Sequence, residues 1–243
     1  MRLQFVGCGD AFGSGGRFNT CLHLTGTQTN VLIDCGASSL VAMKRLGIDR
    51  NAIDAIVVTH FHGDHFAGVP FFVLDAQLIA KRQRPLVLAG PPGLRGWYER
   101  IFAATFPGER TLPFPLTLIE VEISNPNSVA GVQVMPFPVR HDEKAGPCLA
   151  YRIEAEGRVF CYSGDTTWTE TLIDAARGAD LFVCECYVYE KELRAHMSLR
   201  ALRQNLPAIA AKRVVLTHMS DDMLAHTSDV SEACAQDGMI VEF

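Results

Sequence analysis

Short apolar runs closed by glycine fill the first part of the chain and predict buried strands. They occupy residues 3–7 (LQFVG), 21–25 (CLHLT) and 30–36 (NVLIDCG), and the second run alternates apolar and polar positions. A period of two, or a short apolar run bounded by turn residues, is typical of strands. A helix is expected over residues 38–46, where Gly47 fits a C-terminal stop.

Strand and helix patterns then alternate to the end of the chain. Helices are expected over residues 70–84 and 91–106, each with proline at its start, and another after residue 196. Strands are expected over residues 53–60, 84–90, 116–122, 131–141, 148–166, 181–186 and 213–218. The order predicts an α/β or α+β layered fold whose helices cover the sheets. Because no linker-like tract divides the sequence, we expect one domain spanning residues 1–243.

Composition supports an ordinary folded protein and narrows its partners. The chain is 48% hydrophobic with a net charge of -5 and a pI near 5.9, which argues against general attraction to nucleic acid or anionic membrane. The basic run at residues 81–84 (KRQR) is expected on a solvated helix face. The N-terminal MRLQFVGCGD lacks a signal-peptide core, and no apolar stretch approaches about 18 residues. We therefore expect a cytoplasmic protein that does not bind membranes.

The eight cysteines are scattered, several of them inside apolar runs, and most are expected to be small buried hydrophobes. Cys184 and Cys186 would point to one face of a strand, with no further nearby cysteine to complete a tetrahedral metal site. The glycine-rich residues 7–13 (GCGDAFG) do not match a dinucleotide or phosphate-loop pattern, and we expect a flexible active-site loop there.

Residues 59–68 (THFHGDHFAG) carry an unusual density of metal-binding side chains. His60, His62, Asp64 and His65 lie within six positions, between an expected strand end and an expected helix. Around a turn, two successive pairs of ligands can face two points a few ångströms apart. The segment therefore predicts part of a two-metal site with mixed imidazole and carboxylate ligands.

Three later strand ends supply residues that could complete such a site, namely His141, Asp165 and His218. Ligands of layered α/β folds bind beyond the carboxyl ends of strands, so these side chains can converge. By contrast, His23 in an alternating strand and His226 in a polar segment are expected to have no role at the site. IVVTHFHGDH and RVVLTHMSDDM also resemble each other, which suggests two halves related by duplication.

HFHGDH is similar to the H-x-H-x-D-H signature of the metallo-β-lactamase superfamily, and VLIDCG, VRH, SGDT and LTH flank it in that family's order. The resemblance spans nearly the whole chain and implies a four-layer αββα sandwich with two divalent metal ions, most often Zn²⁺, with Mn²⁺ or Fe²⁺ as alternatives. It implies that the first ion is held by His60, His62 and His141, the second by Asp64, His65 and His218, and both by Asp165. The implied activity is metal-dependent hydrolysis by a hydroxide, which Asp64 would orient and whose proton Asp64 would accept as the hydroxide attacks.

A more local likeness concerns residues 181–202 (LFVCECYVYEKELRAHMSLRAL). Glu185 and His196 resemble the E...H-x-[ST] motif of the ribonuclease Z branch, although HMS stands where that branch usually has His-Ser-Thr. The branch also opens with a strand and loop similar to FVGCGDAFGSGGRFNTCLHL. The resemblance implies that His196 binds the phosphate or protonates the leaving oxygen, while Glu185 orients it and keeps it cationic.

The chain differs from that branch in one respect that bears on the substrate. Ribonuclease Z enzymes carry a basic arm that grips transfer RNA, whereas only 23 residues separate His141 from Asp165 here. With the acidic pI, this favours a small phosphodiester, a cyclic nucleotide or a short oligonucleotide over long nucleic acid. The alternatives are an endoribonuclease, or a lactonase, thioesterase or carboxyl-ester hydrolase, which would not need His196. Relatives are often dimers, so a homodimer is a further possibility.

Overall fold

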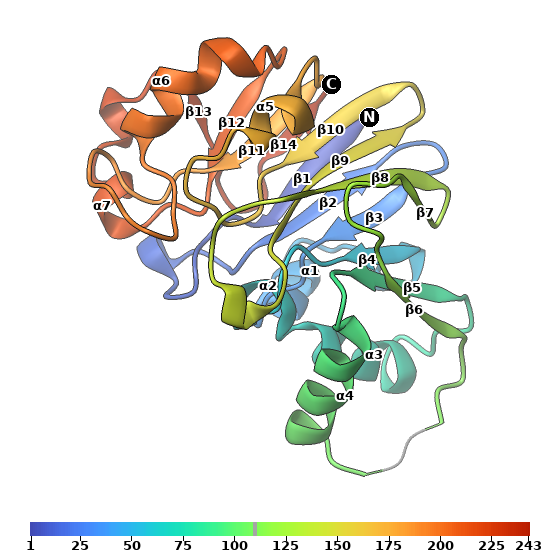
Figure 1. Ribbon diagram of the computed structural model, residues 1–243. Helices are drawn as coiled ribbons and strands as arrows, with labels where there is room; N and C mark the ends of the chain where they lie inside the picture. The colour runs from blue at the N-terminus through green and yellow to red at the C-terminus, as the bar shows by residue number, and fades with distance from the viewer. Residues whose placement is uncertain (109–110) are drawn as a thin grey trace.

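Two seven-stranded mixed sheets pack face to face in the computed structural model, which describes residues 1–108 and 111–243 (Figure 1). In the first sheet the strands lie in the order β14 (Ile240–Glu242), β1 (Arg2–Gly7), β2 (Cys21–Thr25), β3 (Asn30–Ile33), β4 (Ala55–Val57), β5 (Leu86–Gly90) and β6 (Leu116–Glu120). In the second the order is β13 (Ala233–Cys234), β12 (Val214–Thr217), β11 (Leu181–Glu185), β10 (Arg158–Tyr162), β9 (Leu149–Ala155), β8 (Val132–Pro138) and β7 (Asn127–Val129).

Helices cover the outer face of each sheet, on opposite sides of the molecule in Figure 1. The first sheet carries α1 (Ser39–Arg45), α2 (Gly63–Phe66), α3 (Val69–Leu78) and α4 (Leu94–Thr105). The second carries α5 (Thr171–Ala176), α6 (Leu199–Ile209) and α7 (Asp221–Leu224). Short 3-10 turns occupy Ser14–Gly16, Arg50–Ala52, Glu143–Ala145 and Thr227–Asp229. The four-layer αββα sandwich expected from the sequence is confirmed.

The alternation of side chains along the strands produces these layers. Val31 and Ile33 of β3 face the second sheet, whereas Leu32 between them packs under the helices. In β10, Phe160 faces the first sheet and Cys161 faces the outer helices. Because both faces of the central strands are buried, their sequences read as continuous apolar runs.

Parallel pairing brings the candidate residues to one edge of the sandwich. Strands β3, β4 and β5 are parallel in the first sheet, as are β10, β11 and β12 in the second. Strand β8 runs antiparallel to β9, which runs antiparallel to β10, so β8 has the same direction as β10. The loops that follow β8, β10, β11 and β12 therefore leave from one edge of the second sheet, and the loop after β4 of the first sheet meets them there, as expected.

The basic run at residues 81–84 corrects one prediction. It is not on a helix face, because α3 ends at Leu78. The side chain of Arg82 is buried, and its guanidinium donates to backbone carbonyls that include those of Ile53 at 2.7 Å and Pro85 at 2.6 Å. A buried guanidinium needs such acceptors, and the loops that flank β4 and β5 provide them.

The two segments that echo each other in sequence have similar local structures. Each is a parallel strand followed by a short helix, β4 with α2 and β12 with α7. Their common origin stays a hypothesis. Within residues 1–108 and 111–243, no helix combines the length and hydrophobicity needed to cross a bilayer.

Candidate metal centre and active site

The segment after β4 is held in place by a buried aspartate. Asp34 directly follows β3 in a left-handed conformation (φ 61°), and its carboxylate accepts hydrogen bonds from the Thr59 backbone N–H at 2.7 Å and the Thr59 hydroxyl. The same carboxylate lies 2.7 Å from His65 Nδ1. Asp34 therefore holds Thr59, directly before His60, and His65, which lies in α2. These two contacts fix the start and the end of the segment that carries all four candidate ligands.

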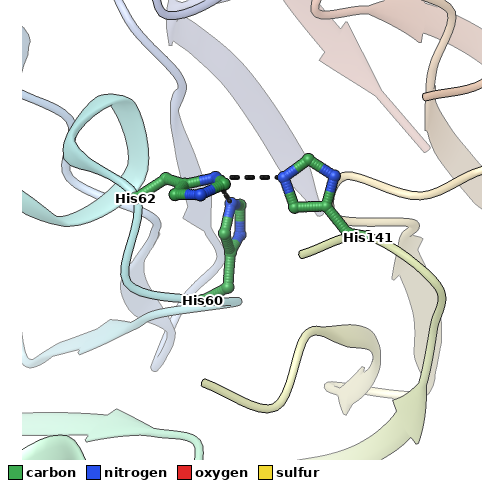
Figure 2. A group of neighbouring side chains, drawn as sticks. All are labelled: His60, His62 and His141. Atoms are coloured by element: carbon green, nitrogen blue, oxygen red, sulfur yellow. Dashed lines mark hydrogen bonds between the residues drawn. The ribbon is translucent and has the colours of Figure 1, made fainter. Parts of the chain in front are cut away.

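Three histidines form the first candidate ligand group. His60 and His62 come from the loop after β4, and His141 approaches from the loop after β8 (Figure 2). His62 Nδ1 lies 3.1 Å from His60 Nε2 and 3.0 Å from His141 Nε2. Three ring nitrogens thus converge on one point, which is the arrangement that a nitrogen-ligated cation needs.

The second ligand group mixes carboxylates with imidazoles and is buried throughout, comprising Asp64, His65, Asp165 and His218. Asp165 Oδ2 lies 3.2 Å from His65 Nε2 and 3.1 Å from His218 Nε2, and Asp64 Oδ2 lies 3.3 Å from His65 Nε2. These ligand atoms come from α2 and from the loops after β10 and β12.

Asp165 lies between the two groups. Besides its contacts in the second group, its Oδ2 is 4.0 Å from His60 Nε2 and 3.9 Å from His141 Nε2 of the first. One carboxylate oxygen therefore lies within reach of four imidazoles, two from each group. This is the position required of a ligand shared by two ions.

The second nitrogen of each imidazole has its own partner. His60 Nδ1 lies 3.1 Å from Thr59 Oγ1, His141 Nδ1 2.7 Å from the Ala195 carbonyl, His218 Nδ1 3.2 Å from Thr20 Oγ1, and His62 Nε2 3.4 Å from Asp142 Oδ2. His65 is held by Asp34, as described above. Such partners fix the ring orientation and the tautomer, as they do for histidines that bind metals.

Two buried polar atoms at the centre make no hydrogen bond, His65 Nε2 and Asp165 Oδ1. Leaving buried polar atoms unpaired is costly, so atoms of this kind indicate a missing partner. Both belong to the second group, and a cation bonded to that group would satisfy them. The nitrogen and oxygen donors suit divalent zinc, manganese or iron.

The charges of the two groups differ. Burial alone would raise the pKa of Asp165, but the imidazoles of His218 and His65 hold it well below its usual range. Burial alone would lower the pKa of His65, but the neighbouring carboxylates raise it. Burial lowers the pKa of His60 well below its ordinary value. The first group is therefore centred on a neutral imidazole, the form that binds metals, whereas the carboxylates of the second group attract positive charge, either as protons on its histidines or as a cation.

Glu185 and His196 form a hydrogen-bonded pair beside the ligand groups. Glu185 is the last residue of β11 and is fully buried, and its carboxylate accepts the Thr166 backbone N–H and lies 3.1 Å from His196 Nδ1. Burial alone would lower the pKa of His196, but the Glu185 carboxylate raises it to about 9. His196 does not open a helix, as the sequence suggested, because α6 begins at Leu199 with Ser198 as its N-cap.

A cavity of about 300 Å³ unites these residues, and its wall is formed by Ala11, Phe12, His62, Asp64, His141, Asp165, Tyr187, His196 and His218. A larger cavity of about 880 Å³ lies between α4 and β6, but none of the histidines or aspartates above lines it. A cavity of about 640 Å³ borders the site but shares only His141 with it, so the chemistry available to a ligand is concentrated in the 300 Å³ cavity.

Other candidates lie outside this cavity. His23 is buried in β2 with Nε2 2.7 Å from Asn30 Oδ1, and His226 stacks on Tyr189 with ring centroids 4.3 Å apart. Cys184 and Cys186 point to the same side of the second sheet and are buried in the outer core. These positions agree with the structural roles expected for them.

Sequence reasoning missed several residues of the site. Asp34 was visible only as an acid at the end of a buried strand, a position where a charge needs a partner. Thr20 and Tyr187 carry no sequence signal that links them to the histidines. Phe12 is a single aromatic residue in a glycine-rich loop, and only its place at the cavity reveals it.

Comparisons with known proteins agree with this architecture. Residues 29–219 match the family described as "Beta-lactamase superfamily domain". Ribonuclease Z from Agathobacter rectalis is 29% identical over 271 aligned positions, covering 88% of each chain. Ribonuclease Z from Methanothermobacter thermautotrophicus is 26% identical, covering 90% of this chain and 87% of its own length.

Solved structures share the fold over almost the whole chain. The metallo-β-lactamase fold protein YhfI from Bacillus subtilis superposes with a TM-score of 0.82 at 19% identity, covering 99% of both chains. The short form of human tRNase Z gives a TM-score of 0.81 at 22% identity, covering 100% of this chain and 99% of its own. A diphosphatase of the PhnP family gives 0.78, also at 22% identity, covering 100% of this chain and 97% of its own.

Proposed function

Because the chain belongs to the β-lactamase superfamily and is a metal-dependent hydrolase related to ribonuclease Z, we propose that it cleaves a small phosphodiester. The observation that carries this proposal is the pair formed by Glu185 and His196. It places a cationic imidazole in the same cavity as both ligand groups. Ester and lactone hydrolysis would not need this residue.

The ligand roles follow from the convergence of donor atoms. His60, His62 and His141 would hold one divalent ion, and Asp64, His65 and His218 a second, with Asp165 shared. The unpaired His65 Nε2 and Asp165 Oδ1 support this assignment, and the donor set favours Zn²⁺, with Mn²⁺ or Fe²⁺ compatible. Bound there, the ions would supply a hydroxide at neutral pH and offset negative charge on the phosphoryl group.

The residues around the ions have separate tasks. The carboxylate of Asp64 lies at the cavity wall, where it can orient an attacking water and accept its proton. His196 Nδ1 is held by Glu185, which leaves Nε2 for the substrate. A protonated Nε2 can donate to a phosphoryl oxygen or to the leaving oxygen, which makes His196 the proposed general acid.

Three features favour a small substrate. The cavity is about 300 Å³. The relative from Agathobacter rectalis aligns over 271 positions although this chain has 243 residues, so it contains stretches with no counterpart here. The net charge of -5 adds no general attraction to long RNA. An endoribonuclease activity remains the second candidate, favoured by the names of the relatives, and a homodimer remains a prediction.

Hydrolysis of bis(p-nitrophenyl) phosphate by the zinc-loaded protein tests the proposal, with His196→Ala compared with His226→Ala. Because p-nitrophenolate leaves without being protonated, this substrate reports only the contact of His196 with the phosphoryl group. On a dinucleoside phosphate, whose alkoxide leaving group needs a proton, losing a general acid costs about 10²- to 10⁴-fold in rate, so we expect a loss of that order for His196→Ala there. His226→Ala, which removes a histidine outside the cavity, should leave the rate unchanged.

Rapid cleavage of carboxyl esters or lactones with no phosphodiesterase activity would overturn the proposal. Full activity of His196→Ala would also favour ester, thioester or lactone hydrolysis. A preference for a long structured RNA over dinucleotides would instead favour the endoribonuclease.

A further inference from the structure

Phe12 stands at the rim of the cavity with its side chain 84% exposed. The next most exposed large hydrophobic side chain among the described residues, Ile79, is 65% exposed and lies at the end of α3. Single exposed apolar residues are common on protein surfaces. Phe12 differs because it lines the cavity whose wall includes members of both ligand groups and His196.

The loop that carries Phe12 is tightly hydrogen-bonded around Asp10. This fully buried carboxylate accepts the backbone N–H groups of Phe12 at 3.2 Å and Ser14 at 2.9 Å, and the Ser14 hydroxyl at 2.7 Å. The Asp10 carbonyl accepts the side-chain amide of Asn19 at 2.9 Å. The aromatic ring is therefore presented from a backbone that several hydrogen bonds hold in place.

The far side of the loop is anchored to α7. The Gly15 backbone N–H donates to Asp221 Oδ1 at 3.0 Å. Gly15 has φ 63°, a left-handed conformation that favours glycine, and a Cβ there would come within 2.8 Å of Leu224 Cδ1, so the Leu224 side chain would have to move. With both sides fixed, little conformational freedom is lost if a ligand covers Phe12.

The cavity leaves part of a substrate outside. At about 300 Å³, with walls made largely of the proposed ligands, it accommodates the reacting phosphodiester and little more. One face of the other aromatic lining residue, Tyr187, is already covered by His196, with ring centroids 4.4 Å apart. Among the described residues no aromatic ring packs on Phe12, so its ring is available to whatever extends past the rim.

We propose that Phe12 is a substrate-contacting residue that stacks on a nucleobase attached to the non-leaving side of the phosphodiester. The inference rests on the proposed function and names its substrate class, a nucleotide-type phosphodiester. An aromatic ring held in place and exposed to water stacks on any base with little sequence preference. Phe12 would thus favour substrates that carry a base, without discriminating between one base and another.

Two substrates with one leaving group test this proposal, thymidine 5′-(p-nitrophenyl phosphate) and methyl p-nitrophenyl phosphate. Stacking of a base on an aromatic side chain is lost on alanine substitution, so kcat/KM of Phe12→Ala for the thymidine ester should fall by about five- to hundredfold. The methyl ester should be cleaved as by the wild type. Phe12→Trp should restore the preference, and Ile79→Ala, which removes an exposed apolar side chain elsewhere, should not change it.

Binding of thymidine 5′-monophosphate and of methyl phosphate to the zinc-loaded chain, measured by calorimetry, separates this inference from the proposed function. We expect Phe12→Ala to weaken binding of the nucleotide selectively. If Phe12→Ala weakens binding of the nucleotide but not of methyl phosphate, and the wild type cleaves neither ester, the phosphodiesterase proposal fails and the assignment of Phe12 stands. Equal affinity of wild type and Phe12→Ala for the nucleotide, or equal losses for both ligands, would overturn the assignment of Phe12.

Discussion

The two ligand groups at the edge of the sandwich differ in chemistry and in exposure. The first consists of three imidazoles, and the His62 side chain is 37% exposed. The second contains two carboxylates and two imidazoles, all of them buried. One group thus offers neutral ligands near water, whereas the other offers negative charge in the interior.

This difference predicts unequal affinities for the two ions. Two carboxylates shielded from solvent attract a divalent cation more strongly than neutral imidazoles do. The unpaired Asp165 Oδ1 and His65 Nε2 also favour binding of a cation by the second group. The first group should therefore exchange its ion more readily, and the second should contribute more to stability. Asp165 couples the groups, because its Oδ2 reaches histidines of both.

The largest effect is expected from Asp165→Asn, which removes the shared negative charge. Metal ions contribute several kcal/mol to transition-state stabilisation, so hydrolysis should fall by about a thousandfold or more. The rate on bis(p-nitrophenyl) phosphate at saturating zinc measures this loss. Near-wild-type activity would show that the two groups do not depend on a common carboxylate.

Removal of metal should lower thermal stability, mainly through the second group. A ligand at a hundred times its Kd stabilises the native state by about 2.7 kcal/mol, which corresponds to about 5–10 °C for a chain of this size. Melting curves with zinc and with chelator should show this difference in the wild type and in His62→Ala. His65→Ala should lose most of it, and an equal loss in both variants would contradict the comparison.

Asp34→Asn should affect the second group selectively. An asparagine that still accepts from Thr59 would turn its amide N–H₂ toward His65 Nδ1, which favours the tautomer with a proton on Nε2. Partners of this kind are worth about 10- to 100-fold in metal affinity, measurable by competition with a chromophoric chelator. An equal loss of affinity for both ions would instead indicate that the substitution destabilises the fold as a whole.

The smallest effect is expected at the exposed end of the first group. Asp142 is 3.4 Å from His62 Nε2 and its side chain is 43% exposed. Exposed ion pairs contribute about 0–1 kcal/mol, so Asp142→Asn should change zinc affinity by less than about fivefold. The same competition assay measures this change in zinc affinity. A change as large as that caused by Asp34→Asn would show that buried and exposed hydrogen-bond partners of the histidines matter equally.

The sequence predicts best those features of the fold and of the site that are encoded within a single strand or turn. Short apolar runs identified the central strands, because Val31, Leu32 and Ile33 are buried on the two faces of their own strand. His60 to His65 stood out because four side chains that can bind metals, three histidines and one aspartate, lie within six positions. His141, Asp165 and His218 were located by their place at strand ends, and their convergence depends on sheet order.

The residues that were misjudged depend on partners distant in sequence. Arg82 was assigned to a solvated helix face because a basic run gives no sign of the carbonyls of residues 50–53 that surround it. Asp34 acts through Thr59 and His65, which lie 25 and 31 residues away. Phe12 looked unremarkable until the fold placed it beside a cavity whose wall combines residues that follow strands of both sheets.

Counting metal ions tests the central claim most directly. The full chain would be dialysed against zinc, freed of excess metal and analysed by mass spectrometry, alongside His62→Ala. We predict close to two zinc ions per chain in the wild type and close to one in the variant, retained by the second group. No bound metal in the wild type, or two ions in both proteins, would contradict the assignment of two groups joined by Asp165.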